Sequence, residues 1–118
     1  MTDRDGNFWD ELTKLAKTNK IVLDRPKGAP HPRYPELIYP LDYGYLEGTT
    51  AGDGDGIDVW FGSFESKTLT GILCTFDKIK RDAEIKLLIG CTKDDIQTIR
   101  DFNGGMRTLF IPNPLVTL

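Results

Sequence analysis

Tyr39-Pro-Leu-Asp-Tyr-Gly-Tyr-Leu-Glu-Gly-Thr-Thr-Ala-Gly-Asp-Gly-Asp-Gly-Ile-Asp58 is the stretch of the chain that carries the most chemical information. It ends in three carboxylates, Asp53, Asp55 and Asp58, which are separated mainly by glycine. Like charges this close repel one another, whereas a hard divalent cation accepts several oxygen ligands. The glycines let the backbone bend until the carboxylates converge. The pattern therefore indicates a divalent-metal site, although a solvated acidic turn would use the same residue types.

A calcium-binding loop of the helix-loop-helix kind is the nearest rival, because it also begins with Asp-x-Asp. That loop requires glycine at its sixth position and glutamate at its twelfth. Counted from Asp53, these positions hold Asp58 and Phe64, so the sequence does not fit the template.

A second acidic pair, Asp77 and Asp82, flanks a turn between two apolar segments. If these segments form a hairpin, the pair could face residues 53–58 and extend the site to several metal ions. Aspartate is also common in turns, and Lys78, Lys80 and Arg81 lie beside the pair. The pattern alone leaves both interpretations open.

The segment before the acidic stretch is rich in proline, which excludes a regular helix or a central strand until about residue 41. Its tyrosines supply enough apolar surface to hold an ordered loop against the core. Loops of this length are usually functional. The cations Arg25, Lys27 and Arg33 in this loop are either solvated surface charges or an oxyanion clamp.

Two helices are predicted. Apolar residues recur at helical spacing from residue 7 to about 18, with Asn7 as a capping residue and acidic residues in the first turn. We expect the apolar face of this helix to pack on its own domain rather than on a partner. The second helix begins after Thr92, which forms a capping box with Asp95, and ends at the glycine pair 104–105.

Segments rich in β-branched and aromatic residues, separated by turn residues, predict strands at residues 21–24, 57–61, 71–76 and 83–89. Residues 107–118 are expected to be extended. The spacing of the strands favours a meander or a small barrel, and therefore an α+β, mainly β fold.

Length and composition are those of one globular domain over residues 1–118, with 39% hydrophobic and 28% charged residues. No stretch reaches the roughly 20 apolar residues of a membrane span, and the N-terminus lacks a signal-peptide pattern, so we expect a cytoplasmic protein. A net charge of −3 without a basic block argues against nucleic acid as a partner. Cys74 and Cys91 are predicted to be buried thiols rather than zinc ligands or a disulfide.

The quoted residues resemble the soluble family I inorganic pyrophosphatases. The shared pattern is Tyr39-Pro-x-x-Tyr-Gly-Tyr, followed, without a gap in spacing, by Asp-Gly-Asp-Gly-Ile-Asp-Val. The family signature is Asp-x-Asp-Pro-hydrophobic-Asp-hydrophobic, from which only Gly56 departs. The resemblance extends from segment 21–24 to the spacing of Asp77 and Asp82, and it favours the metal-site interpretation of both acidic groups.

The resemblance implies a small closed or partly open β-barrel of the OB-like pyrophosphatase fold, with an N-terminal and a C-terminal helix. It implies that Asp53, Asp58 and Asp82 bind the principal Mg²⁺ ions. Asp77 would assist a further ion, and Asp24 would be an outer ligand.

The same resemblance assigns Asp55 to orienting or deprotonating the attacking water. Tyr43 and, less directly, Tyr39 would contact phosphate or brace the acidic cluster through their hydroxyls. These roles agree with metal-assisted phosphoanhydride chemistry, in which bound ions lower the pKa of a water and neutralise phosphate charge.

This chain also departs from the family in its cations. The family has a longer hairpin before the Tyr39 motif, carrying a phosphate-binding Lys, a Glu and an Arg, and Arg25, Lys27 and Arg33 are candidate substitutes. Glu84 occupies the place of a family lysine, and Lys86 lies two residues further on, on the same face of a strand. The family has a Tyr-Lys pair near its C-terminus. The comparable region of this chain reads Arg100-Asp-Phe-Asn103 and lacks that pair.

These inferences predict Mg²⁺-dependent hydrolysis of inorganic pyrophosphate to two phosphates by a metal-activated water, with Mn²⁺ or another divalent ion as an alternative cofactor. Because the cationic residues are altered, two other functions stay open. One is hydrolysis of another phosphoanhydride, such as a nucleotide diphosphate, and the other is metal binding without catalysis. Relatives of bacterial origin form symmetric oligomers, so the resemblance also implies a homo-oligomer.

Overall fold

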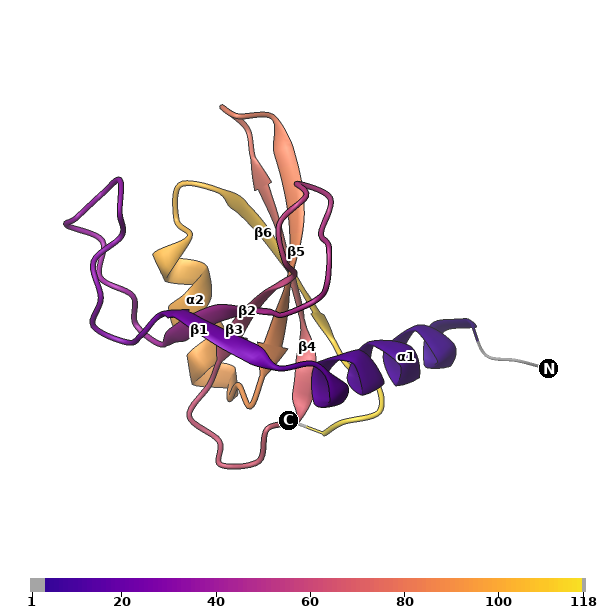
Figure 1. Ribbon diagram of the computed structural model, residues 1–118. Helices are drawn as coiled ribbons and strands as arrows, with labels where there is room; N and C mark the ends of the chain where they lie inside the picture. Colours follow the sequence, from indigo (N-terminus) through magenta and orange to yellow (C-terminus); the bar gives the residue numbers. More distant parts are fainter. Residues whose placement is uncertain (1–3, 118) are drawn as a thin grey trace.

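The computed structural model, which describes residues 4–117, has a twisted six-stranded sheet and two helices (Figure 1). In chain order the elements are α1 (Arg4–Thr18), β1 (Ile21–Arg25), β2 (Asp42–Leu46), β3 (Asp58–Phe61), β4 (Leu69–Asp77), β5 (Asp82–Ile89), α2 (Lys93–Phe102) and β6 (Arg107–Pro112). The strand order is β1-β2-β3-β5-β4-β6, and neighbours are antiparallel except β3 and β5. The strands β1 and β6 form the two edges of the sheet, which confirms a mainly β fold in the form of a partly open barrel.

Both predicted helices are present. The helix α2 begins with the predicted capping box, in which the Thr92 side chain accepts from Asp95 N and the Asp95 side chain accepts from Thr92 N. The helix α1 begins at Arg4, which is three residues before the predicted start. Asn7 therefore lies inside the helix, and its predicted role as the capping residue is wrong.

The strand β2 was not predicted, yet it lies between β1 and β3 within the sheet. Gly44 explains why β2 was missed, because glycine is uncommon in strands. It also explains how β2 fits between its neighbours, because only glycine leaves room for β1 there. A Cβ atom at this position would lie 2.0 Å from the carbonyl oxygen of Val22 on β1. The glycine of the Tyr-Gly-Tyr motif thus allows the close approach of β1 that brings Tyr43 into the sheet.

The sheet carries a hydrophobic core on each face because successive side chains of a strand alternate between faces. On β5, Leu87 and Ile89 pack with Trp9 of α1, whereas Leu88 packs with Ile96 and other residues of α2. The alternation places the even-numbered residues of β5 on the α2 face. Three of them, Asp82, Glu84 and Lys86, are charged.

Two predictions from composition are tested by the structure. Cys91 is fully buried, and burial raises the pKa of its thiol to about 12, but Cys74 is only half-buried. The prediction of two buried thiols is therefore right for Cys91 alone. Among residues 4–117, no helix has the length and apolar character needed to cross a membrane.

Candidate active site

Lys86 is the centre of a polar network on the α2 face of the sheet. Its Nζ donates to the hydroxyl oxygen of Tyr43 at 2.8 Å, to Asp58 Oδ2 at 3.1 Å and to Glu84 Oε2 at 3.3 Å. These partners come from β2, β3 and β5, which are neighbours in the sheet. The Lys86 side chain is only 9% exposed, so its charge is neutralised within the protein rather than by water.

The network fixes the protonation of its members. Burial alone would lower the pKa of Lys86, but Tyr43, Asp58 and Glu84 outweigh it and hold that pKa above its usual range. Burial, reinforced by the nearby Asp58 carboxylate, raises the pKa of Tyr43. Lys86 is therefore a cation and Tyr43 a neutral phenol at any physiological pH.

The network lies at a cavity of about 470 Å³ between the loop after β1, the β4–β5 hairpin and the end of α2. The charged residues that line this smaller cavity balance in number: Arg25, Lys80, Lys86, Asp58, Asp77 and Glu84. Trp60 also lines it, and the buried indole Nε1–H of Trp60 has no hydrogen-bond acceptor among residues 4–117. A buried donor without a partner is costly, typically about 1–3 kcal/mol.

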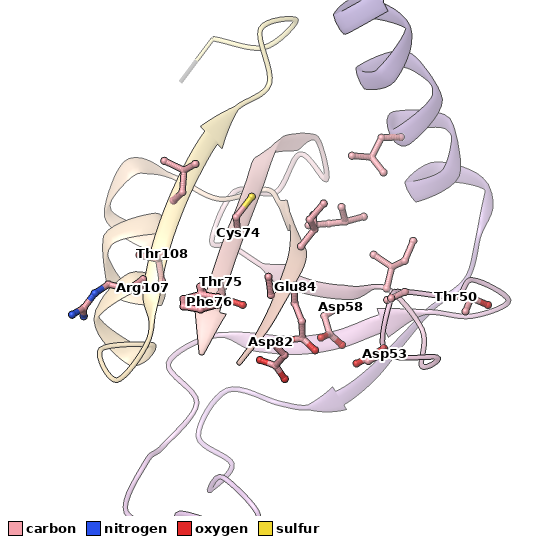
Figure 2. A pocket seen from close by; sticks show the side chains of 18 of the residues that line it. Thr50, Asp53, Asp58, Cys74, Thr75, Phe76, Asp82, Glu84, Arg107 and Thr108 are labelled. Carbon is pink, nitrogen blue, oxygen red and sulfur yellow. The ribbon is translucent and has the colours of Figure 1, made fainter. Parts of the chain in front are cut away.

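A larger cavity of about 790 Å³ opens on the α1 side of the sheet and has mostly apolar walls. Figure 2 shows that its acidic residues gather along one end of the cavity, while Arg107 points away from them. These acidic residues are Asp53, Asp58, Asp82 and Glu84. Asp58 and Glu84 line both cavities, so the acidic end of the larger one adjoins the Lys86 network.

The structure brings together only part of the predicted acidic set. Asp53, Asp58 and Asp82 line the larger cavity, and Asp77 lines the smaller one. Asp77 Oδ1 also accepts the backbone N–H groups of Ile79 and Lys80, as turn aspartates do.

Two predicted acids line neither cavity. Asp55 is exposed in the turn that follows Asp53, whose Oδ1 accepts the Asp55 backbone N–H at 3.0 Å. Asp24 is exposed and pairs with Arg25 at 3.8 Å. Asp24 lies on the edge strand β1 and Asp55 in the glycine-rich turn, and neither carboxylate lines either cavity.

The predicted phosphate-binding residues divide in the same way. Tyr39, Tyr43, Arg25 and Lys86 line the smaller cavity, and Arg25 Nη1 donates to the Tyr39 hydroxyl at 3.1 Å. Lys27 and Arg33 are exposed and line neither cavity. Of the three cations predicted to lie in the loop, only Arg25 reaches the cavity, and the structure places it at the end of β1 rather than in the loop.

A protein-family model described as inorganic pyrophosphatase matches residues 11–108, which is most of the chain. The chain belongs to the inorganic pyrophosphatase family. A search of curated proteins gave no match.

Pyrophosphatases of this family generally use divalent metal ions, so the acidic residues must be tested as ligands. Their chemistry fits, because every candidate is a carboxylate and carboxylate oxygens suit hard cations such as Mg²⁺. Among residues 4–117, however, no three His, Cys, Asp or Glu side chains converge closely enough to hold an ion. The Nζ of Lys86 instead pairs with Asp58 and Glu84. The candidate ligands thus suit a metal in their chemistry, but one of them, Asp58, is already paired with an internal cation.

Among the residues that line the two cavities, Glu84, Lys80 and His31 have titratable side chains that were not predicted to belong to the site. The alternation of Asp82, Glu84 and Lys86 along one strand face was a usable signal for Glu84. Lys80 and His31 gave no such signal, because each lies in a loop whose position depends on the tertiary structure.

Proposed function

We propose that this chain hydrolyses inorganic pyrophosphate to two phosphates in a Mg²⁺-dependent reaction. Membership of the pyrophosphatase family supports the reaction class. The observation that carries the proposal is the Asp58–Lys86 pair at the boundary of the two cavities, because it sets a carboxylate and a buried cation side by side. Residues 1–118 would form one catalytic domain, acting in the cytoplasm.

Charge balance supports the need for a metal. The charges lining the smaller cavity cancel in number, so the protein alone offers no net positive charge to a polyanion. Pyrophosphate carries several negative charges, and binding it requires additional cations. The carboxylates at the end of the larger cavity are suitable ligands for them.

The principal ions would be held by Asp53, Asp58 and Asp82. Asp77 would assist a further ion, and Asp24 would be an outer ligand. When bound, Mg²⁺ would neutralise phosphate charge and make a nearby water more acidic. Mn²⁺ could replace it, because it prefers the same oxygen ligands.

In the reaction, a water oxygen forms a bond to one phosphorus while the bond from that phosphorus to the bridging oxygen breaks. Asp55 would accept the proton of the water, and the departing phosphate would end with the proton on its former bridging oxygen. Arg25 and the Tyr43 hydroxyl would donate to phosphoryl oxygens from the wall of the smaller cavity. Lys86 would join them when a metal ion takes over Asp58, one of its three acceptors. Asp55 reaches the water only if the glycine-rich turn closes toward Asp58, which its glycines permit.

A phosphate-release assay tests the proposal. Purified protein with Mg²⁺ should release phosphate from pyrophosphate, and a chelator should stop the release. Asp55→Asn should abolish turnover, whereas Asp94→Asn, an exposed change in the first turn of α2, should not. Absence of pyrophosphate turnover with Mg²⁺, Mn²⁺ and other divalent ions would sink the proposal. If the protein hydrolysed only a nucleotide diphosphate, that compound would take the place of pyrophosphate as the substrate.

Metal binding without catalysis is a second candidate, prompted by the Arg100-Asp-Phe-Asn103 segment, which lacks the Tyr-Lys pair of the family pattern. It predicts heat of Mg²⁺ binding in calorimetry with no phosphate released from any phosphoanhydride. The first candidate predicts both signals, so parallel calorimetry and assay on one preparation separate the two.

A further inference from the structure

His31 is the only histidine of the chain, and it lines the smaller cavity. It lies in the loop between β1 and β2, which is held by an isolated bridge between Pro30 and Ile38 and by a 2.8 Å bond from His31 N to Leu37 O. The imidazole stacks on the buried Tyr39 ring, with 6.1 Å between centroids and an interplanar angle of 5°. The ring is therefore fixed by both its backbone and its neighbour.

The hydrogen bonds of this ring identify which nitrogen carries the proton. The backbone N–H groups of Arg33 and Tyr34 both donate to Nδ1, at 3.1 and 3.3 Å. A ring nitrogen that accepts hydrogen bonds has no proton, so the neutral imidazole carries its proton on Nε2. No hydrogen bond from Nε2 is found within residues 4–117.

The surroundings favour the neutral ring. Burial and the nearby positive charges of Arg25, Arg33 and Lys80 lower the pKa of His31, and Glu36 opposes them only weakly. At pH 7 the residue is consequently a neutral donor among cations. Two of these cations, Arg25 and Lys80, line the same cavity.

We propose that Nε2–H of His31 donates a hydrogen bond to a phosphoryl oxygen of the substrate in the smaller cavity, which makes His31 a substrate-binding residue. This inference rests on the proposed function and adds a member to its anion-binding wall. A neutral donor suits a wall where Arg25 and Lys80 already lie near, because it adds a hydrogen bond without further charge repulsion.

Two variants separate the contact with substrate from the structural role of the ring. In His31→Asn the side-chain oxygen can still accept the Arg33 and Tyr34 N–H groups, but no group reaches the position of Nε2. In His31→Gln the amide N–H reaches that position. We expect KM for pyrophosphate to rise about 10-fold in His31→Asn and to recover in part in His31→Gln. Both variants lose the stacking on Tyr39, so a loss of stability from that contact is common to the two. Equal KM values in wild type and His31→Asn would overturn the proposal.

Nuclear magnetic resonance gives a readout that does not depend on turnover, because a single histidine yields one unambiguous pair of ring nitrogen signals. Inorganic phosphate, added with Mg²⁺ to protein labelled with ¹⁵N, should shift the Nε2 signal of His31 and leave the Nδ1 signal nearly unchanged. If phosphate shifts the Trp60 indole signal but not that of His31, the inference is wrong and the proposed function stands. If the His31 signal shifts in a protein that releases no phosphate from pyrophosphate, anion binding at His31 is supported and the proposed function fails.

Discussion

The Nζ of Lys86 lies 3.1 Å from Oδ2 of Asp58, although the two residues come from different strands, β5 and β3. Asp58 is also the predicted metal ligand that lines both cavities. One carboxylate thus faces two possible cations, a lysine of the chain and a metal ion from solution. This relationship leads to the first three predictions.

Lys86→Met should destabilise the fold by about 2 kcal/mol, because it leaves Asp58 and Glu84 close together without their shared cation. Urea denaturation measures the change, with Lys78→Met in the exposed hairpin turn as the matched control. Mg²⁺ should stabilise Lys86→Met more than wild type, because the two carboxylates become available to it. If Mg²⁺ stabilised both proteins equally, Lys86 and the metal ion would not compete for Asp58 and Glu84.

The stability of the protein should fall as the pH rises above about 10. Tyr43 and Lys86 both have raised pKa values in the fold, so both favour their protonated forms there. Their contribution is complete below the unfolded pKa values, about 10 for tyrosine and 10.4 for lysine, and is lost as the pH rises toward the higher folded values. Thermal melts from pH 8 to 11 measure this loss, which should be smaller in Tyr43→Phe. An identical profile in that variant would contradict the assignment.

Asp58→Asn should weaken Mg²⁺ binding by at least about 10-fold, since the amide loses the charge that a hard cation prefers. Titration calorimetry gives the affinity directly. Asp94→Asn is the control, because it removes one negative charge at a residue that lines neither cavity. This variant should bind Mg²⁺ as wild type does. An unaltered affinity in Asp58→Asn would remove Asp58 from the ligand set.

Gly44→Ala should destabilise the protein by about 2–3 kcal/mol, because its Cβ would meet the Val22 carbonyl oxygen at 2.0 Å and separate β1 from β2. Gly52→Ala is the control, since nothing lies within 4 Å of a Cβ there. Chemical denaturation of both variants provides the comparison. Wild-type stability of Gly44→Ala would mean that the two strands do not approach as described.

Asp95→Asn should cost about 1–2 kcal/mol by weakening the start of α2. The Asp95 carboxylate accepts the N–H groups of Ser63 and Thr92, and these bonds outweigh burial and lower its pKa. Its contribution is complete above the unfolded aspartate pKa of about 3.9 and is lost as the pH falls through the lower folded value. The free energy of unfolding, measured by denaturation between pH 2 and 6, should therefore fall less steeply with decreasing pH in Asp95→Asn than in wild type. Parallel pH profiles of the two proteins would refute this.

Much of the fold could be predicted because local rules decide it. The capping box of Thr92 and Asp95 forms within one helix turn, and the strands on either side of Asp77 and Asp82 meet across a short turn. The start of α1 and the strand β2 were missed for opposite reasons. The helix extends past a good capping residue, Asn7, and β2 contains a glycine that only its contact with Val22 explains.

The types and spacings of the aspartates, together with the tyrosine motif beside them, were enough to predict an inorganic pyrophosphatase-like chain, because both can be read from the primary structure. Only the tertiary structure decided which of them meet. It joined Lys86 to Asp58 and Tyr43, placed Arg25 and His31 at one cavity, and left Asp55, Lys27 and Arg33 outside. The physical reason is that these contacts depend on strand register and loop closure between distant segments, which no local pattern specifies.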